Sequence, residues 1–356
     1  MITAFRTMIV KCTDIKAALN EFFSANAFDR YFLLTDENTL TCCLPLLKGV
    51  KQLDEASLIT VRSGDEHKNI ESLSYIWAVL GNGQATRSSL MISLGGGVIT
   101  DIGGFAAATF KRGMANINIP TTLLGAVDAA VGGKTGINFN GLKNEVGSFA
   151  MPSRVFIDAM FYKTLSRTEL LSGYAEMLKH GLLSDIEALA ELLNFDFDAS
   201  DYAALGEMAY RSVQIKEAIV AQDPREEGIR KALNLGHTVG HAFEALSHRM
   251  EEPVPHGYAV AWGLICELYL SHKTQGFPNT LLQQVVHFTR EHYGVYAFDC
   301  KQYEALYGYM LHDKKNRSGQ VNFTFLKNVG EIAIDCHVTK EEVFESLDFY
   351  RESLGI

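Results

Sequence analysis

The sequence predicts two domains: a Rossmann-like parallel α/β domain over residues 1–168 and a mainly helical domain over residues 169–356. Three observations support this fold class. The chain has 356 residues with 47% hydrophobic content, which is more than one ordinary core accommodates. The first half alternates short β-rich runs with helical stretches, as parallel α/β sheets do. The second half carries long segments with the apolar periodicity of helices.

The predicted elements follow from their local patterns in chain order. We expect strands at 30–35, 57–62, 88–94 and 117–122, where β-branched and other apolar residues are dense. The helical domain should contain helices at 169–184, 202–221, 236–248, 257–273 and 280–292. Alternating apolar and polar residues predict a hairpin over 319–334, and a final helix over 339–354 begins at the capping residue Thr339.

Composition and charge exclude several classes of function. A net charge of −10 and a pI near 5.6 disfavour nonspecific binding to nucleic acid or anionic membranes, so an anionic substrate must meet a local basic pocket. The six cysteines have no C-x-x-C spacing, and we expect them to be reduced core thiols. The sequence shows no signal-peptide pattern and no apolar run of about eighteen residues, which predicts a cytoplasmic protein.

A pair of imidazoles predicts a metal site. His237 and His241 are four residues apart and share one face of a predicted helix. Zinc peptidases need a glutamate directly after the first histidine as general base, and Thr238 occupies that position, which argues against a peptidase. With Glu176 and His256 as further candidates, two histidines and one carboxylate would leave an open position on zinc.

The spacing alone leaves the ligand set open. Either His237 or His241 could be the ligand, and Glu176 with His180 form another pair four residues apart. A buried histidine that is hydrogen-bonded to a backbone carbonyl is more common than a metal ligand, so a single histidine carries little weight. Only the combination of these residues favours a metal.

A glycine-rich turn in the α/β half predicts a phosphate site. Gly95, Gly96 and Gly97 lie between a predicted strand and a helix, where main-chain amides can approach a pyrophosphate. Thr100 stands at the third glycine position of G-x-G-x-x-G, so the fingerprint is incomplete, and a tight turn without ligand explains it equally well. The later segment 128–136 is similar to the end of a P-loop, but Asp128 replaces its first glycine, which excludes nucleoside triphosphate hydrolysis.

Cationic and amide side chains are frequent near segment 128–136 and in the helical half. Arg112, Lys134, Lys143 and Asn144 suit a phosphate or a carboxylate, although isolated lysines are usually solvated. Glu226, Arg230 and Asn234 follow at four-residue steps ahead of His237 and His241, which predicts one helix face that carries all five side chains. Three further lysines could contribute charge or lie at the surface: Lys179, Lys216 and Lys314.

In combination these segments resemble the 3-dehydroquinate synthase family of the sugar phosphate cyclase group, over about residues 36–314. The elements that carry the resemblance are Gly95-Gly96-Gly97-Val98-x-x-Asp101, Lys111-Arg112-Gly113, Pro120-Thr121-Thr122-Leu123-Leu124, 128–136, Lys143-Asn144, 176–180, 230–244 and His256-Gly257. Two positions depart from the family pattern. Asp65 stands where glutamate is common, and Ser172 stands where asparagine is frequent.

The resemblance implies a dehydroquinate synthase-like fold with NAD in a cleft between the two domains, one zinc ion that cobalt can replace, and a homodimer. It implies conversion of 3-deoxy-D-arabino-heptulosonate 7-phosphate to 3-dehydroquinate and phosphate, a lyase reaction of the shikimate pathway of aromatic amino acid and chorismate biosynthesis. Transient oxidation by NAD, elimination of phosphate, reduction and intramolecular aldol closure would make up this reaction.

The resemblance also implies roles for residues. The metal ligands are Glu176, His237 and His256, which makes His241 a catalytic or substrate-binding residue, while Glu226 matches a proton acceptor. Arg112 matches a residue that reaches the neighbouring subunit's substrate. The implied catalytic residues are Lys134, Lys179, Glu226, Arg230, Asn234 and His241. The implied substrate contacts are Arg112, Lys143, Asn144, Lys179, Lys216, Arg230, Asn234, His241, His256 and Lys314. The implied NAD contacts are Asp36, Asn38, Asp65, Lys68, Gly95, Gly96, Gly97, Val98, Asp101, Thr121, Thr122, Asp128, Lys134, Lys143, Phe161 and Thr164.

Three alternative functions share parts of this residue set. Another sugar phosphate cyclase, of the inosose or valiolone synthase type, would differ in the substrate contacts. A metal-dependent polyol or alcohol dehydrogenase would release NADH and would need fewer phosphate-binding cations. A noncatalytic NAD- and zinc-binding regulator would have no use for Glu226, Lys179 and His241 beside the ligands.

Overall fold

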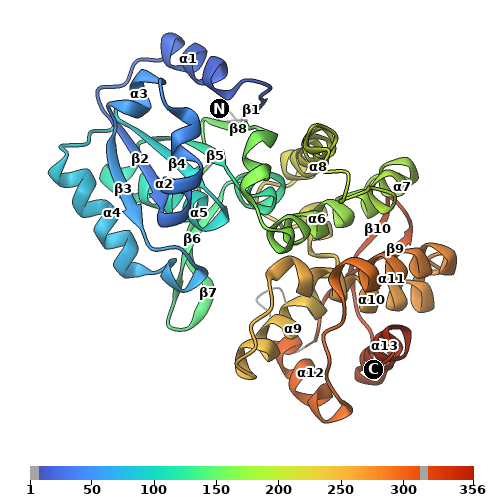
Figure 1. Ribbon diagram of the computed structural model, residues 1–356. Coiled ribbons are helices and arrows are strands. Elements are labelled where there is room, and N and C mark those ends of the chain that lie inside the picture. The colour runs from blue at the N-terminus through green and yellow to red at the C-terminus, as the bar shows by residue number, and fades with distance from the viewer. Residues whose placement is uncertain (1–7, 313–319) are drawn as a thin grey trace. The chain divides into compact units, whose positions relative to one another are not determined.

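The computed structural model describes residues 8–312 and 320–356, which form two compact units (Figure 1). The first unit extends to Ser166 and also takes Asp201–Glu217, and the second contains Arg167–Ser200 and Ala218–Ile356. The predicted helical domain includes residues 201–217, whereas in the structure most of helix α8 (Tyr202–Gln222) groups with the first unit.

A six-stranded parallel sheet forms the centre of the first unit, in the order β1-β8-β5-β4-β2-β3. Its strands are β1 (Met8–Lys11), β2 (Tyr31–Asp36), β3 (Ser57–Val61), β4 (Leu90–Gly95), β5 (Ala115–Pro120) and β8 (Arg154–Ile157). The four strands predicted from sequence, β2 to β5, are confirmed. The edge strand β1 and strand β8 were not predicted, because four residues are too few for a clear periodicity.

Helices cover both faces of this sheet. Successive side chains along a strand accordingly pack into two different apolar clusters, one on each face. Leu33 of β2 belongs to one apolar cluster with α1 (Ile15–Ala25). Its neighbours Phe32 and Leu34 belong to a second cluster with α4 (Ile70–Asn82) and α5 (Gly97–Thr109). Strand β4 is buried along its whole length. A sheet buried on both faces is what parallel α/β folds require. Two short helices, α2 (Glu37–Cys42) and α3 (Lys51–Asp54), complete the α/β layer.

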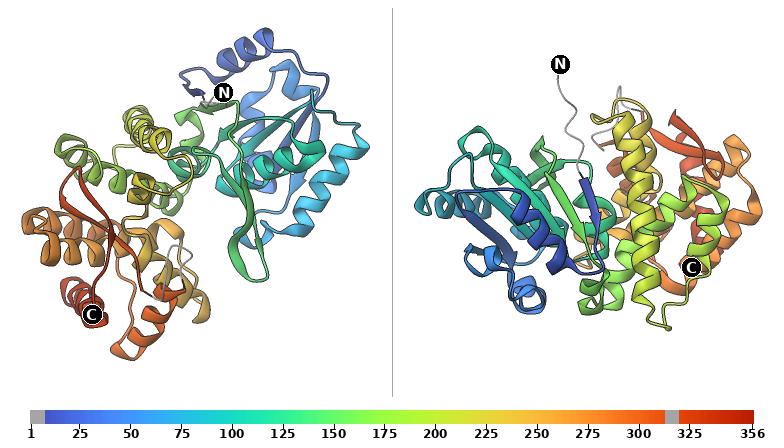
Figure 2. Two further views of the ribbon diagram at one scale, coloured as in Figure 1. Left: turned by 180° about the vertical axis from the view of Figure 1, so that it is seen from behind. Right: turned by 90° about the horizontal axis from the view of Figure 1, so that it is seen from above.

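An antiparallel hairpin of β6 (Lys134–Phe139) and β7 (Leu142–Phe149) projects from the first unit (Figure 2, left). It was not predicted, because segment 128–136 was interpreted only as a P-loop-like turn. In the structure a single π-helical turn covers Gly125–Ala129, and the strand begins at Lys134.

The second unit is mainly helical, as expected. Its helices are α6 (Arg167–Leu182), α7 (Ile186–Leu193), α9 (His237–Arg249), α10 (His256–Gln275), α11 (Asn279–Tyr293), α12 (Tyr303–Leu311) and α13 (Lys340–Leu354). Helix α10 lies at its centre and packs against α6, α9, α11 and α13. The predicted hairpin is present as β9 (Phe323–Asn328) and β10 (Glu331–Cys336), and Thr339 caps α13 through the amide of Glu342, as predicted.

The predicted continuous helix face from Glu226 to His241 is wrong. Residues Ile229–Asn234 form 3-10 turns, and α9 begins only at His237. Gly236 precedes this helix with φ +78°, a left-handed conformation that interrupts helical geometry. Glu226 lies in the preceding turn with φ +62°. The four-residue spacing was therefore misread as helical periodicity.

The cysteines correspond only partly to the expected core thiols. Cys12, Cys43 and Cys266 are buried, but Cys42 and Cys300 are exposed, and none of the six forms a disulfide in the described structure. Cys42 is the last residue of α2 and faces outward, whereas the following residue, Cys43, is buried. Among the described residues, every helix is too short or too polar to span a lipid bilayer.

Candidate active site

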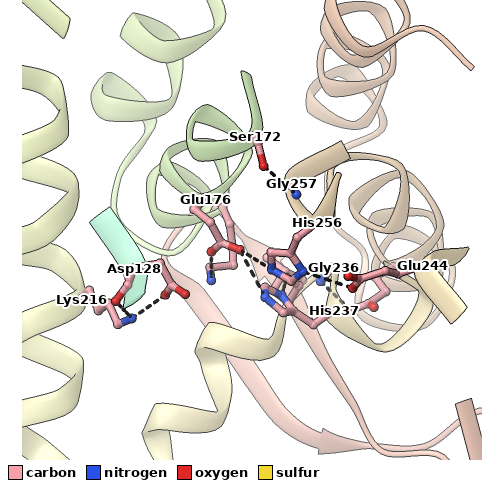
Figure 3. Close-up of polar contacts among 12 residues, drawn as sticks. Asp128, Ser172, Glu176, Lys216, Gly236, His237, Glu244, His256 and Gly257 are labelled. Atoms are coloured by element: carbon pink, nitrogen blue, oxygen red, sulfur yellow. Dashed lines mark hydrogen bonds and ion pairs between the residues drawn. The ribbon is translucent and has the colours of Figure 1, made fainter. Parts of the chain in front are cut away.

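Three potential metal ligands converge in the second unit from three helices (Figure 3). Glu176 lies in the middle of α6, while His237 and His256 are the first residues of α9 and α10. Oε1 of Glu176 is 3.2 Å from Nε2 of His237 and 3.5 Å from Nε2 of His256. Because each histidine is the first residue of a helix, the packing of that helix determines where its Cα lies.

These distances fit a zinc ion. Zinc bonds of about 2.0–2.1 Å at tetrahedral angles place two ligand atoms roughly 3.3 Å apart, close to both measured separations. Oε1 of Glu176 is fully buried and accepts no hydrogen bond from the described residues, although burial of a carboxylate oxygen without a hydrogen bond is costly. A cation between these three atoms would satisfy it. Two histidines and one carboxylate would leave a fourth position for substrate.

The other nitrogen of each imidazole has its own partner. Nδ1 of His237 donates to the carbonyl of Leu235 at 3.1 Å, and Nδ1 of His256 lies 3.4 Å from Oε2 of Glu244. Both contacts favour the tautomer whose Nε2 carries the lone pair, as ligation requires. Glu244 is not among the site residues predicted from sequence. Its position seven residues after His237, on the same face of α9, is the signal that could have identified it.

Electrostatics couple the three groups. Burial would raise the pKa of the Glu176 carboxyl, but Lys179 and His237 hold it well below its usual value. Burial lowers the pKa of His237 to about 4, although Glu176 opposes this change. Burial also opposes protonation of His256, yet Glu176 and Glu244 outweigh it and raise the pKa of His256. In the absence of metal, the His256 imidazole is therefore the group that carries a proton.

The remaining predicted residues of this unit surround the cluster. Lys179 is buried on α6 and forms an ion pair with Oε2 of Glu176, which leaves Oε1 for a cation. The ring of His241 is exposed and lies 5.3 Å from that of His237 and 5.9 Å from that of His256. His241, Glu244 and His256 also lie close enough to share a cation, so the geometry brings His241 to the site. The alternative residue His180 is buried in α6.

The polar residues before α9 lie close together, although the helix predicted for this segment is replaced by 3-10 turns. Nδ2 of Asn234 donates to Oε1 of Glu226 at 2.9 Å. The Arg230 guanidinium is buried and donates to the carbonyl of Pro224 at 2.7 Å, and its amide donates to Asp223 at 3.1 Å. Lys314 lies outside the described residues.

The glycine-rich turn of the first unit has the geometry of a phosphate site. It leads from the carboxyl end of β4 into α5, whose capping residue Gly96 offers no side chain to the first amides. A Cβ on Gly125 would lie 3.3 Å from the Gly97 nitrogen, and one on Gly96 would lie 3.0 Å from Thr122. The absence of these side chains keeps the helix N-terminus accessible, as anion binding requires. Thr121 donates to the Gly95 carbonyl at 3.0 Å, which joins the two adjacent strand ends.

Several predicted cofactor residues of the first unit form ion pairs with residues that are distant in sequence. The buried Lys68 ammonium lies 2.8 Å from Asp101, whose own pKa is raised by burial although Lys68 opposes this. Lys143 lies 3.4 Å from Asp65. The buried Lys216 forms an ion pair with Asp128 and donates to its carbonyl at 2.6 Å (Figure 3).

Two other predicted residues, Asp36 and Thr164, form hydrogen bonds within their own segments. Asp36 caps α2 by accepting the Thr39 amide at 2.7 Å, and the neighbouring Asn38 is exposed. Phe161 is buried, and Thr164 donates to its carbonyl at 2.7 Å. The residues Val98, Lys134, Arg112 and Asn144 are half-buried or exposed. Arg112 and Asn144 have positive φ values of 67° and 51°, an uncommon conformation for residues other than glycine.

The fold of the whole chain is that of sugar phosphate cyclases. It is similar to 2-epi-5-epi-valiolone synthase from Streptomyces hygroscopicus, solved with NAD+ and Zn2+, with a TM-score of 0.85 and 23% identity over 97% of each chain. It is also similar to 2-deoxy-scyllo-inosose synthase, solved with carbaglucose-6-phosphate, NAD+ and Co2+, with a TM-score of 0.82 and 20% identity over 97% of this chain and 96% of that one.

Sequence comparison identifies the family. Residues 58–172 match the sequence model of the 3-dehydroquinate synthase N-terminal domain, and residues 173–316 match that of the C-terminal domain. A 3-dehydroquinate synthase from Parabacteroides distasonis is 55% identical over 98% of this chain and 99% of its own length. The chain belongs to the 3-dehydroquinate synthase family.

Proposed function

We propose that this protein converts 3-deoxy-D-arabino-heptulosonate 7-phosphate to 3-dehydroquinate and phosphate, as a lyase of the shikimate pathway. The observation that carries this proposal is the 55% identity to a 3-dehydroquinate synthase over nearly the full length of both chains. The convergence of Glu176, His237 and His256 on one point supports it, because the reaction needs a polarising cation at the substrate hydroxyls.

The proposal assigns a cofactor site to each unit. Glu176, His237 and His256 would hold zinc or cobalt, and the turn from Gly95 to Gly97 at the start of α5 would hold the pyrophosphate of NAD. Two cyclases of the same fold were solved with NAD+ and one of these metals. When bound, the metal supplies Lewis-acid polarisation of substrate hydroxyls, and NAD supplies a reversible hydride acceptor.

The side chains of the protein position the substrate and move protons in this proposal. Lys179, Arg230 and Asn234 would orient the anionic ends of the substrate and stabilise developing charge. Glu226, held by Asn234 at 2.9 Å, would accept a proton. The roles of Lys134, His241 and Lys216 as catalytic or binding residues belong to the same proposal.

The proposal also covers oligomeric state, a contact between subunits and cellular location. We expect a homodimer in which Arg112 reaches the neighbouring active site, and a cytoplasmic location. Sedimentation of the purified protein, with and without substrate, would test the dimer. Mixed dimers of an Arg112→Ala subunit with a Glu176→Gln subunit would test the exchange, because only a shared active site restores turnover in such a mixture.

Turnover with product analysis tests the reaction. We expect equal amounts of phosphate and dehydroquinate from 3-deoxy-D-arabino-heptulosonate 7-phosphate when the zinc-loaded protein receives NAD. Release of phosphate only from other sugar phosphates would indicate a cyclase of the inosose or valiolone synthase type. Net formation of NADH from simple polyols would instead indicate a dehydrogenase.

A further inference from the structure

The two helices that begin with metal-binding histidines lack N-caps of their own. Gly236 precedes α9 and Pro255 precedes α10, and neither residue provides a side-chain hydrogen bond to the first turn. A helix start has amides without intrahelical partners, and these need acceptors when they are buried. His237, Thr238 and Val239 are all buried, so the acceptors must come from elsewhere in the protein.

A buried carboxylate from the neighbouring helix supplies two such acceptors at the start of α9. Glu267 lies on α10 with no exposed surface. Its Oε2 accepts the amide of Gly236 at 2.7 Å, and its Oε1 accepts the amide of Val239 at 3.0 Å. Both carboxylate oxygens thus bind the chain on either side of His237. A carboxylate at a helix N-terminus gains additional stabilisation from the helix dipole.

Close packing of the two helices fixes this arrangement. Gly263 lies one turn before Glu267 on α10, and a Cβ at that position would be 2.1 Å from the carbonyl oxygen of Gly236. A Cβ on Gly240 would be 2.9 Å from the carbonyl oxygen of Ala259. The two backbones therefore touch near the start of α9, and Glu267 has little freedom to move relative to His237.

From this geometry we propose that Glu267 is a positioning residue for the zinc ligand His237. It does not touch the ligand atoms. It holds the Gly236 and Val239 amides and thereby sets the direction of the His237 side chain toward Glu176. This inference rests on the proposed metal site formed by Glu176, His237 and His256.

A second contact of the same kind supports the inference. Oγ of Ser172 on α6 accepts the amide of Gly257 at 3.2 Å, next to the ligand His256 (Figure 3). Ser172 also lies one turn before Glu176, so α6 holds the start of α10 in the way that α10 holds the start of α9. Each of these two helices is thus aligned by a neighbouring one, α9 by Glu267 and α10 by Ser172.

The test is the affinity of the purified full-length chain for Zn2+, measured by competition with a chromogenic chelator. Glu267→Gln replaces one acceptor oxygen by an NH2 group that faces a main-chain donor. We expect a 10–100-fold loss of affinity, the range found when a residue that orients a ligand is removed. The matched control is Asp185→Asn, which alters a carboxylate that caps α7 through the Ala188 amide at 2.8 Å. It should retain wild-type affinity.

Stability measurements separate positioning from a purely structural role. Circular dichroism of each metal-free variant verifies its fold before titration. If Glu267→Gln does not fold, Glu267→Asp keeps the charge but is one methylene too short for both amides, and its affinity should fall by a smaller factor. Wild-type Zn2+ affinity in whichever folded variant is titrated would overturn the inference, even if its unfolding temperature were lower. If the wild-type protein itself bound no Zn2+, the proposed metal site would fail instead.

Discussion

At the residue scale, Glu176 holds the three candidate metal ligands together. Its Oε1 faces both histidines and its Oε2 is paired with Lys179. We predict that Glu176→Gln lowers Zn2+ affinity by more than about 100-fold, which exceeds the effect of losing an orienting residue. Chelator competition measures this loss, with Glu187→Gln on the exposed face of α7 as control. Retention of wild-type affinity in Glu176→Gln would exclude Glu176 as a ligand.

A separate prediction concerns Glu244, which contacts His256 on the side of the imidazole away from Glu176. Removal of this acceptor in Glu244→Ala frees the imidazole to rotate and lowers the basicity of Nε2. Zn2+ affinity should fall about 10–100-fold. Glu244→Gln keeps an acceptor oxygen and should lose less. Equal losses in both variants would mean that the negative charge of Glu244 matters more than its hydrogen bond.

The charge pattern of the cluster predicts that metal binding releases a proton. Glu176 and Glu244 raise the pKa of His256 above its ordinary value of 6.5, so the metal-free protein retains this proton at neutral pH. Zinc needs the lone pair of Nε2 and must displace the proton, so affinity should increase by about tenfold per pH unit between about pH 6 and 8. Titration calorimetry in buffers of different ionisation enthalpy measures the proton. A binding heat independent of the buffer would contradict the prediction.

At the element scale, contact between α9 and α10 depends on glycine. A Cβ at Gly263 would meet the Gly236 carbonyl, and neither backbone can yield without moving α9 or α10. We expect Gly263→Ala to lower the free energy of unfolding by about 1–3 kcal/mol or more, as overpacking does. Denaturant unfolding of the metal-free protein measures this change.

The control for this variant is Gly308→Ala in α12, where a Cβ would have open space. Alanine is the better helix former there and should raise stability by about 0.5–1 kcal/mol. If Gly263→Ala were as stable as the wild-type protein, the close contact between the helices would be relaxed in solution.

Elements with strong periodicity were predictable from sequence, whereas those fixed by tertiary contacts were not. The buried strand β4 and helix α10 have apolar patterns long enough to indicate their type. The hairpin of β6 and β7 is largely exposed and follows a glycine-rich segment, so no apolar alternation marked it. The false helix before His237 arose because four-residue spacing between polar residues also occurs across turns.

At the scale of the whole molecule, the site residues come from segments separated by tens of residues. Glu176 and His256 were candidates from the sequence, but only the family resemblance joined them with His237 into one ligand set, because spacing cannot show that α6 and α10 meet. The pairs Lys68 with Asp101 and Asp128 with Lys216 likewise depend on the path of the chain. Glu267 was missed altogether, since a single glutamate in an apolar helix has no sequence signal for the amides that it binds.

Turnover on a limiting amount of NAD distinguishes the proposed reaction from a simple oxidation. The zinc-loaded protein with less NAD than enzyme and an excess of 3-deoxy-D-arabino-heptulosonate 7-phosphate should release many phosphates per NAD, without accumulation of NADH, because each cycle restores the cofactor. One NADH for each substrate consumed, or no phosphate from a folded protein that binds both cofactors, would contradict the proposed dehydroquinate synthase reaction.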